Sequence, residues 1–302
     1  SDLISSMNSA LKEVTKGINA SEILKINLST TLTTNAIIEN KTDTVGLLIS
    51  SGPGINPEEH SHGDNFHILE GSIDHRGTVI KEIKDNELTK AIDSCKKNNI
   101  TSYGVISKFS TRNPEHENYI GSKLPNDSHI TYGHKLSGQL SFPRRISTSY
   151  FNAAVYTIFN QFADAIEETT KDLKIDAEIN ILKADGGTMP LDLARQRPVE
   201  SILSGPAASI MGIISLCHIE EDSVILDIGG TTTDIAIFAS GAPLIERDGI
   251  TIKESPTLVR SLKNKSIGLG GDSTIKVSEE KISVGPERLG ASVADGGSQI
   301  TL

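Results

Sequence analysis

The chain contains no tryptophan, only two cysteines among its 302 residues, and few aromatic residues, which make up 4% of the total. The cysteines, Cys95 and Cys217, lie far apart and lack the C-x-x-C spacing of a zinc site or the density of a disulfide framework. We therefore expect the fold to depend on an apolar core and the protein to reside in a reducing cytoplasm.

Basic residues are also in short supply. Lysine and arginine number 29 against 39 aspartates and glutamates, for a net charge of -10. Because nucleic-acid binding depends on basic side chains, this balance predicts no nucleic-acid surface. No apolar run approaches the roughly 20 residues of a membrane span, and the N-terminus has no signal pattern. The partners we expect are small molecules or other proteins, and no membrane.

What the sequence does contain is an alternation of short apolar runs and helical periodicity. Strands are predicted at 23–28, 44–49, 102–107, 128–132, 178–182, 223–228 and 234–238, and a hairpin turn at 74–77. Helices are predicted at 32–39, 86–97, 113–124, 149–173 and 204–216. Short strands are also expected around Lys276 and Ile282. This alternation is typical of an α/β fold, and the near-continuous apolar run SVILDI predicts a strand buried on both faces.

The length of the chain permits two lobes, and we place their boundary within 135–149. Ser1 is not a methionine, and an amphipathic pattern starts immediately after it. We therefore expect an incomplete N-terminus. At the other end, residues 300–302 stop without a tail.

The stretch DIGGTTTD, residues 227–234, suggests chemistry. Gly229 and Gly230 allow a tight turn whose backbone amides, with the hydroxyls of Thr231 and Thr232, can hold phosphate. Carboxylates repel phosphate, so Asp227 and Asp234 make sense there only with Mg²⁺ or its waters between them and the anion. The alternative is a plain hairpin turn capped by Asp227.

Three further glycine-rich segments accompany this turn. They contain Gly186 and Gly187 in ADGGT, Gly205 in SGPAAS, and Gly270 and Gly271 in GLGGDS. All three follow or adjoin predicted strands, and in an α/β sheet such ends converge on one cleft. Together the four segments predict a nucleotide-binding bed.

In order along the chain, LKADGGTMPLDLARQRPVESILSGPAASIMG, DIGGTTTD and SIGLGGDS resemble the hydantoinase A and 5-oxoprolinase family, which includes N-methylhydantoinases and the ATP-binding subunits of acetone-type carboxylases. The upstream segment LSTTLTTNAIIENKTDTVGLLIS resembles the N-terminal module of that family. The resemblance implies an N-terminal module at 1–140 and an ATP-binding module at 141–302.

That family is similar to the superfamily of actin, sugar kinases and heat-shock chaperones. The resemblance implies two RNase H-like lobes with ATP and Mg²⁺ between them. Gly229, Gly230 and Thr231 would cradle the β- and γ-phosphates, Asp227 would lie on the Mg²⁺ hydration shell, and Asp234 would orient a water or a neighbouring loop. Gly270 and Gly271 would lie against the nucleotide.

The resemblance also implies a first phosphate-loop hairpin at the N-terminus and a C-terminal extension. This chain contains neither, and we expect weak or absent activity from it by itself.

The implied reaction is ATP-dependent hydrolysis of a cyclic amide, a hydantoin or 5-oxoproline, through phosphorylation of the amide oxygen. A second, large hydantoinase B-like subunit is the implied protein partner. The alternatives are a carboxylase subunit that activates a ketone, a non-enzymatic ATP-driven switch or reactivating factor, and a simple kinase.

Other residues allow two interpretations each. Arg195 and Arg197 could meet a substrate carboxylate or phosphate, although solvated surface charges explain them more simply. His60, His62 and His67 have the ligand type for a metal, but they occur in a polar loop. The threonines of 30–34 suit either a helix cap or an anion site. His134, Arg144 and Arg145 carry no sharp signal.

Overall fold

The computed structural model describes residues 3–278 and 281–285, which form two compact units. Unit 1 comprises the described parts of Ser1–Lys183, Gly187–Ile202 and Asp248–Arg260. Unit 2 comprises the described parts of Ala184–Gly186, Leu203–Arg247 and Ser261–Leu302. The chain therefore passes between the units several times instead of crossing at a single linker. Residues 300–302 lie outside the described part.

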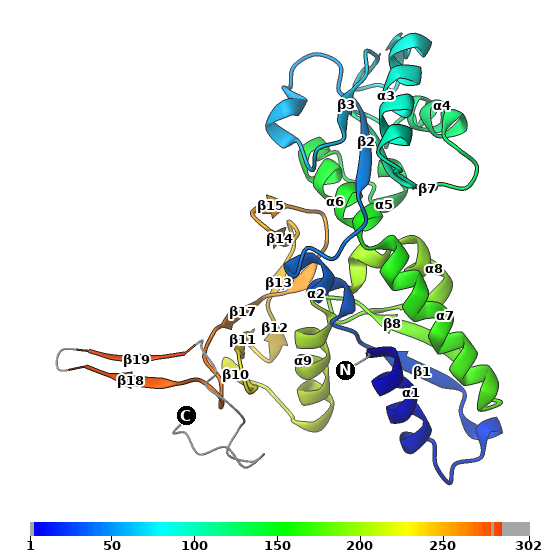
Figure 1. Ribbon diagram of the computed structural model, residues 1–302. Coiled ribbons are helices and arrows are strands. Elements are labelled where there is room, and N and C mark those ends of the chain that lie inside the picture. The colour runs from blue at the N-terminus through cyan, green and yellow to red at the C-terminus, as the bar shows by residue number, and fades with distance from the viewer. Residues whose placement is uncertain (1–2, 279–280, 286–302) are drawn as a thin grey trace. The chain divides into compact units, whose positions relative to one another are not determined.

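The larger sheet of unit 1 has four parallel strands in the order β3-β2-β6-β7. They are β2 (Val45–Ser50), β3 (Phe66–Ile68), β6 (Ser102–Ser107) and β7 (His129–Tyr132). Every residue of β2 and β6 is buried, because helices lie on both faces of the sheet (Figure 1). The strands expected at 44–49, 102–107 and 128–132 are confirmed.

Three helices cover this sheet. The helices α3 (Asp85–Lys97) and α4 (Glu115–Lys123) pack on one face, and α6 (Phe142–Ala154) packs on the other. The first face is filled by Leu48, Leu88, Ile92, Cys95, Tyr103, Val105 and Ile120, and the second by Leu47, Ile49, Ile106, Phe142, Ile146 and Ala153. The short helix α5 (Gly133–Leu136) follows β7 directly. The helices expected at 86–97 and 113–124 are confirmed.

A smaller sheet of unit 1 joins distant parts of the sequence. The strand β1 (Lys25–Leu28) pairs in parallel with β8 (Glu178–Leu182), and β8 pairs antiparallel with β9 (Thr188–Pro190). The helices grouped with it are α1 (Leu3–Val14), α2 (Leu32–Ile38), α7 (Tyr156–Asp172) and α8 (Leu191–Gln196). Its core contains Phe159, Phe162, Ala163, Ile166, Ile181, Met189, Leu191 and Ala194.

Two small hairpins and three short 3-10 helices complete unit 1. The hairpins are β4 (Ser72–Ile73) with β5 (Val79–Lys81), and β14 (Thr251–Ile252) with β15 (Ser255–Pro256). The 3-10 helices are Ala20–Glu22, Pro57–His60 and Pro198–Ser201. The turn expected at 74–77 is confirmed, because the Asp74 carboxylate accepts hydrogen bonds from the backbone N–H groups of Arg76 and Thr78.

Unit 2 is an antiparallel structure with α9 (Ser204–Leu216) as its helix among the described residues. In its main sheet β11 (Thr233–Ala239) pairs with β10 (Ser223–Ile228), β12 (Ala242–Pro243) and β17 (Asn264–Ile267). Two further pairs are β13 (Ile245–Glu246) with β16 (Ser261–Leu262), and β18 (Ile275–Val277) with β19 (Ile282–Val284). With unit 1 this gives a mixed α/β fold.

The prediction of one helix at 149–173 is wrong. The backbone leaves helical geometry at Val155, which has φ -103° and ψ 6° and ends α6 while it precedes α7. The apolar residues of α6 pack against the parallel sheet, whereas those of α7 join the core of the smaller sheet. The two halves of this periodic segment therefore pack into different cores, and the helix is interrupted at Val155 between them. Since α6 also packs inside unit 1, the lobe boundary expected within 135–149 is not a division between the two units.

The prediction that the strand in SVILDI is buried on both faces is also wrong. Val224, Leu226 and Ile228 are more than half exposed, with relative accessibilities of 62%, 55% and 66%. Ile225 is buried, as are Ala236 and Phe238 on β11. The helix α9 contacts β10, and one helix covers only one face of a sheet.

Candidate functional site

The DIGGTTTD segment forms the end of the β10–β11 hairpin. The two strands are in register from Ser223 opposite Phe238 to Ile228 opposite Thr233. The turn between them is closed by the Gly229 N–H, which donates to the Thr232 carbonyl at 2.9 Å. The plain-hairpin interpretation therefore describes the local backbone correctly, and the contacts of the turn decide what else it does.

A second glycine-rich loop, which follows β17, is bonded to this turn. The N–H groups of Gly271 and Asp272 donate to the carbonyls of Gly229 and Gly230, over 2.9 and 2.7 Å. The Thr233 hydroxyl donates to the Leu269 carbonyl at 2.6 Å. Two of the predicted glycine segments, about 40 residues apart in sequence, are thus held against each other within unit 2.

This approach requires glycine. A Cβ atom on Gly270 would lie 2.5 Å from the Gly230 carbonyl oxygen and 2.6 Å from that of Gly229. On Gly230 it would lie 2.7 Å from a carboxylate oxygen of Asp272. Gly271 is different, because a Cβ there would meet no atom closer than 3.8 Å. The contact between the loops therefore explains Gly270, which meets backbone atoms, whereas the Asp272 carboxylate near Gly230 is the movable end of a side chain.

Some backbone N–H groups of the turn already donate hydrogen bonds within the protein, and others do not. The Gly229 N–H, which we expected to hold phosphate, is already bonded inside the turn. Among the described residues, the N–H groups of Gly230, Thr231 and Thr232 donate no hydrogen bond, and these three residues are exposed. Consecutive exposed amides in a turn form a concavity suited to an anion.

The two acidic residues face each other across the hairpin. Asp227 on β10 is the cross-strand partner of Asp234 on β11, so both side chains lie on the same face of the sheet, and both are half-buried. Like charges directly opposite destabilise a strand pair unless a cation lies between them. Mg²⁺ is commonly bound by one or two carboxylates, with water and substrate phosphates as its other ligands. The pair fits such a site, although no group of three His, Cys, Asp or Glu side chains suited to a metal occurs among the described residues.

The remaining predicted glycines lie apart from this loop pair in the chain. Gly186 has a φ of +83° and approaches the sulfur of Met211 on α9, since a Cβ there would lie 2.8 Å from that atom. Gly205 lies in the first turn of the same helix. Gly187 belongs to unit 1 and closes the β8–β9 turn by accepting a hydrogen bond from the Lys183 N–H at 2.8 Å.

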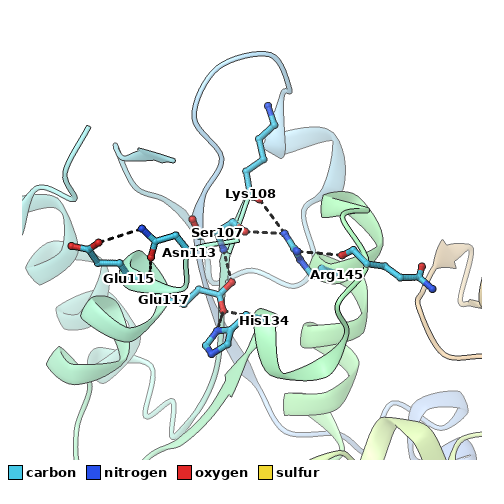
Figure 2. Close-up of polar contacts among 8 residues, drawn as sticks. Ser107, Lys108, Asn113, Glu115, Glu117, His134 and Arg145 are labelled. Carbon is cyan, nitrogen blue, oxygen red and sulfur yellow. Dashed lines mark hydrogen bonds and ion pairs between the residues drawn. The ribbon is translucent and has the colours of Figure 1, made fainter. Parts of the chain in front are cut away.

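A buried polar cluster in unit 1, formed by Glu117, His134 and Arg145, is the feature that sequence reasoning missed (Figure 2). The fully buried Glu117 carboxylate accepts hydrogen bonds from the Ser107 N–H at 2.8 Å, from the His134 N–H at 2.9 Å and from its Nδ1 at 2.5 Å. The fully buried Arg145 guanidinium donates to the carbonyls of Ser107, Lys108 and Gln139. Two opposite charges therefore hold the end of β6 from both sides.

A helical-period signal could have located Arg145. It lies three residues after Phe142, next to Ile146 and four before Ser149, all of which are buried. Such a position faces a core, where an arginine needs acceptors. Burial lowers the pKa of Arg145, and the nearby Glu117 charge opposes that shift.

Several other candidate residues have structural partners, whereas the buried Nε2 of His67 has none among the described residues. Arg195 joins α8 to α7 through ion pairs with Asp164 at 2.7 Å and Glu167 at 2.8 Å. His62 stacks on Tyr150 with ring centres 5.0 Å apart, and its Nε2 lies 3.0 Å from the Ser147 hydroxyl. Burial lowers the pKa of His62. The Thr30 hydroxyl accepts a hydrogen bond from the Leu32 N–H at 3.0 Å, whereas Thr31, the N-cap residue of α2, makes no side-chain capping bond.

A mixed α/β fold, with a glycine turn that presents three amides beside paired carboxylates, is typical of proteins that bind phosphate-containing ligands. Comparison with known families makes this class specific. The hydantoinase/oxoprolinase family model matches residues 145–302, and that of the hydantoinase/oxoprolinase N-terminal region matches residues 1–126. The chain belongs to the hydantoinase/oxoprolinase family.

Curated relatives include caprolactamase subunit alpha of Pseudomonas jessenii, 26% identical over 291 residues, and 5-oxoprolinase of Saccharomyces cerevisiae, 25% identical over 232 residues. These alignments cover 87% and 74% of this chain but only 41% and 18% of the relatives. The chain thus corresponds to less than half the length of either protein.

Two solved structures share the fold. The nucleotide-free acetone carboxylase superposes with a TM-score of 0.76 at 17% identity, over 95% of this chain and 45% of that one. The ATP-dependent caprolactamase of Pseudomonas jessenii gives a TM-score of 0.72 at 21% identity, over 99% of this chain and 48% of that one. Among the described residues, no helix has the length and apolar character to cross a membrane.

Proposed function

We propose that this chain is the ATP-binding part of an ATP-dependent amidohydrolase that opens a cyclic amide such as a hydantoin, 5-oxoproline or a larger lactam. The observation that carries the proposal is the bonded pair of loops, in which the Gly229–Thr232 turn is fixed by Gly270–Asp272 and adjoins Asp227 and Asp234. The family and the names of its curated relatives support the same reaction class.

In this proposal the amides of Gly230, Thr231 and Thr232 bind the terminal phosphates of ATP. Asp227 holds Mg²⁺ through the hydration shell of the ion, which would neutralise the phosphate charge, and Asp234 orients a water or a neighbouring loop. Gly270 and Gly271 lie against the nucleotide, and Gly186, Gly187 and Gly205 complete its bed. We further propose that the chain forms lobes of the actin-like type and that 1–140 and 141–302 are two sequence modules, whose boundary differs from that of the two compact units.

The chemistry follows from the poor reactivity of an amide carbonyl. The amide oxygen attacks the γ-phosphorus and ADP leaves, so the oxygen becomes part of a leaving group. Water then adds to the ring carbon, the C–N bond breaks as nitrogen takes a proton, and a second water releases phosphate from the acyl phosphate. The protein contributes position and charge stabilisation, which are the main protein contributions to phosphoryl transfer.

A protein partner is part of the proposal, because one curated relative is named as an alpha subunit. The partner would be a second, large subunit of the hydantoinase B type. The substrate would be a small cyclic amide, with ATP and Mg²⁺ required for turnover.

The first experiment measures ATP binding to this chain in the presence of Mg²⁺ by calorimetry. Asp227→Asn is expected to weaken binding by about tenfold or more, because it removes a charge next to the metal. Asp93→Asn, which changes an exposed carboxylate on α3, is the matched control and should bind as the parent does. Absence of ATP binding, or unchanged binding by Asp227→Asn, contradicts the proposal.

The second experiment measures phosphate release by the complete enzyme with its partner, against hydantoins, 5-oxoproline, caprolactam and small ketones. Stimulation by a cyclic amide together with a ring-opened product supports the hydrolase. Stimulation by ketones alone indicates the carboxylase instead, and a stable phosphorylated product indicates a kinase. Nucleotide-dependent partner binding with no small-molecule stimulation indicates a switch.

A further inference from the structure

Unit 1 contains a pocket that the proposed ATP site does not use. It has a volume of about 410 Å³ and is lined by residues of β7, α5, α7 and the segment that follows α8. Its lining includes His129, Tyr132, His134, Lys135, Tyr156 and Arg197. A pocket of this size can enclose a small organic molecule.

The charged side chains that line the pocket are positive. Lys135 and Arg197 line it, whereas no aspartate or glutamate does so among the residues described. Within the described part of the chain, Arg197 has one ion pair, a long one of 3.8 Å to Glu200, and Glu200 is also bound by Lys183 at 3.2 Å. In a chain with a net charge of -10, such a pocket selects an anion.

Flat rings form much of the rest of the wall. His129 stacks on Tyr156 with ring centres 3.3 Å apart and an angle of 11° between the planes. Lys135 lies over the Tyr132 ring, 4.7 Å from its centre. These contacts cover one face of Tyr156 and one face of Tyr132. Each ring has a second face, and such a face packs against a planar apolar body, which a simple inorganic anion does not have.

His134 adds a directed polar atom. Its Nδ1 is bound by the buried Glu117 carboxylate, and its Nε2 has no hydrogen-bond partner among the described residues. The Nδ1–Glu117 bond, drawn in Figure 2, fixes the ring, and because His134 lines the pocket its Nε2 is free to bond a polar group of a ligand there.

We propose that this pocket binds a small organic carboxylate with a flat ring or unsaturated body. Arg197 and Lys135 hold the carboxylate, Tyr132 and Tyr156 pack against the flat body, and His134 bonds a polar edge. Glu117 is a positioning residue that acts through His134. The pocket is separate from the ATP-binding proposal and requires neither nucleotide nor metal.

The test compares three probes by NMR titration of the chain. Benzoate has both a flat ring and a negative charge. Benzamide has the ring without the charge, and inorganic phosphate has the charge without the ring. Benzoate is expected to bind with a Kd of about 1 mM or tighter and to shift resonances of the pocket residues. Benzamide and phosphate should bind about tenfold more weakly or worse, since each loses one set of contacts.

Two variants and a matched control locate the binding. Arg197→Gln is expected to weaken the binding of benzoate by about tenfold, and Lys135→Gln is expected to weaken it severalfold. Lys123→Gln is the control, because Lys123 lies over the Tyr119 ring at 5.1 Å in the same kind of contact but outside the pocket. It should leave benzoate binding unchanged.

Several outcomes would overturn the proposal. These are no binding of benzoate in the millimolar range, equal binding of benzamide or phosphate, and unchanged binding by Arg197→Gln. Since the titrations contain no ATP, failure of this proposal leaves the proposed ATPase untouched, and the reverse also holds.

The role of Glu117 has its own readout. In the parent chain the ¹⁵N shifts of His134 should report a protonated Nδ1, because Nδ1 donates to Glu117. Glu117→Gln should redistribute the proton between the two ring nitrogens and weaken benzoate, with the chain still folded. Unchanged ¹⁵N shifts would show that Glu117 does not set the state of His134.

Discussion

Two apolar strands of similar sequence character behave differently in the two units. The strand β2 in unit 1, with the sequence VGLLIS, is buried along its whole length between helices on both faces of a parallel sheet. The strand β10 in unit 2, with the sequence SVILDI, exposes every second residue. The difference shows that an apolar run predicts a strand, whereas the helices packed around it decide how much is buried.

The same contrast extends to the polar groups. Unit 1 buries the charged side chains of Glu117 and Arg145, and each of them has several backbone hydrogen-bond partners there. Unit 2 keeps the Asp227–Asp234 pair half-buried beside exposed amides. Buried, satisfied charges hold a loop in place, whereas a partly solvated pair of like charges is suited to a ligand that supplies the missing positive charge.

The largest expected effect tests the difference in burial between β2 and β10. Leu47→Ala on β2 should lower the free energy of unfolding by about 3 kcal/mol, because Leu47 is fully buried and leaves a cavity. Leu226→Ala on β10, where the side chain is 55% exposed, should cost less than about 0.5 kcal/mol. Urea unfolding of both variants checks the pair, and similar losses would refute the contrast.

A smaller effect concerns His129, a partly buried histidine that lines the pocket. Burial lowers the pKa of His129 to about 4, below its usual 6.5, so between these values the unfolded chain binds a proton that the folded chain does not. Stability is therefore lost as the pH falls from 6.5 toward 4, by roughly 2 kcal/mol at pH 4.5. His129→Gln should lose less over the same range. Urea unfolding at pH 7 and 4.5 measures the difference, and identical losses would contradict it.

The contact between the two glycine loops can be broken at one atom. Gly270→Ala should destabilise unit 2 by about 1.5 kcal/mol and weaken ATP binding, because the new Cβ meets two carbonyl oxygens inside 2.7 Å. Gly271→Ala is the matched control, with free space of 3.8 Å. Calorimetry of unfolding and of ATP binding distinguishes them. Equal behaviour of the two variants would show that the loop contact is unimportant.

The smallest effect tests the acidic pair itself. Without Mg²⁺, Asp234→Asn should stabilise the chain by about 0.5 kcal/mol, since it removes a like charge opposite Asp227. With Mg²⁺ and ATP the same variant should lose the ligand-induced rise in Tm that the parent shows. Thermal unfolding under both conditions measures this, and a rise equal to that of the parent would exclude a role for Asp234.

Much of the local structure could be predicted from the sequence. The strands at 44–49 and 102–107 and the helix at 86–97 are where periodicity places them, because each has one strongly preferred burial pattern. The contact between Gly229–Thr232 and Gly270–Asp272 was expected only as convergence at strand ends, and pairing of β11 with β17 produces it. Whether Gly186, Gly187 and Gly205 join the same site remains a prediction.

The sequence by itself determined which segments become strands, helices and glycine turns, and which family the chain belongs to, because these depend on local pattern. Only the tertiary structure decided that 149–173 is interrupted at Val155, that one face of β10 stays exposed, and that Arg197 and His134 line the same pocket. The physical reason is that burial and site formation depend on which elements pack together, and residues from four separate elements share no local signal.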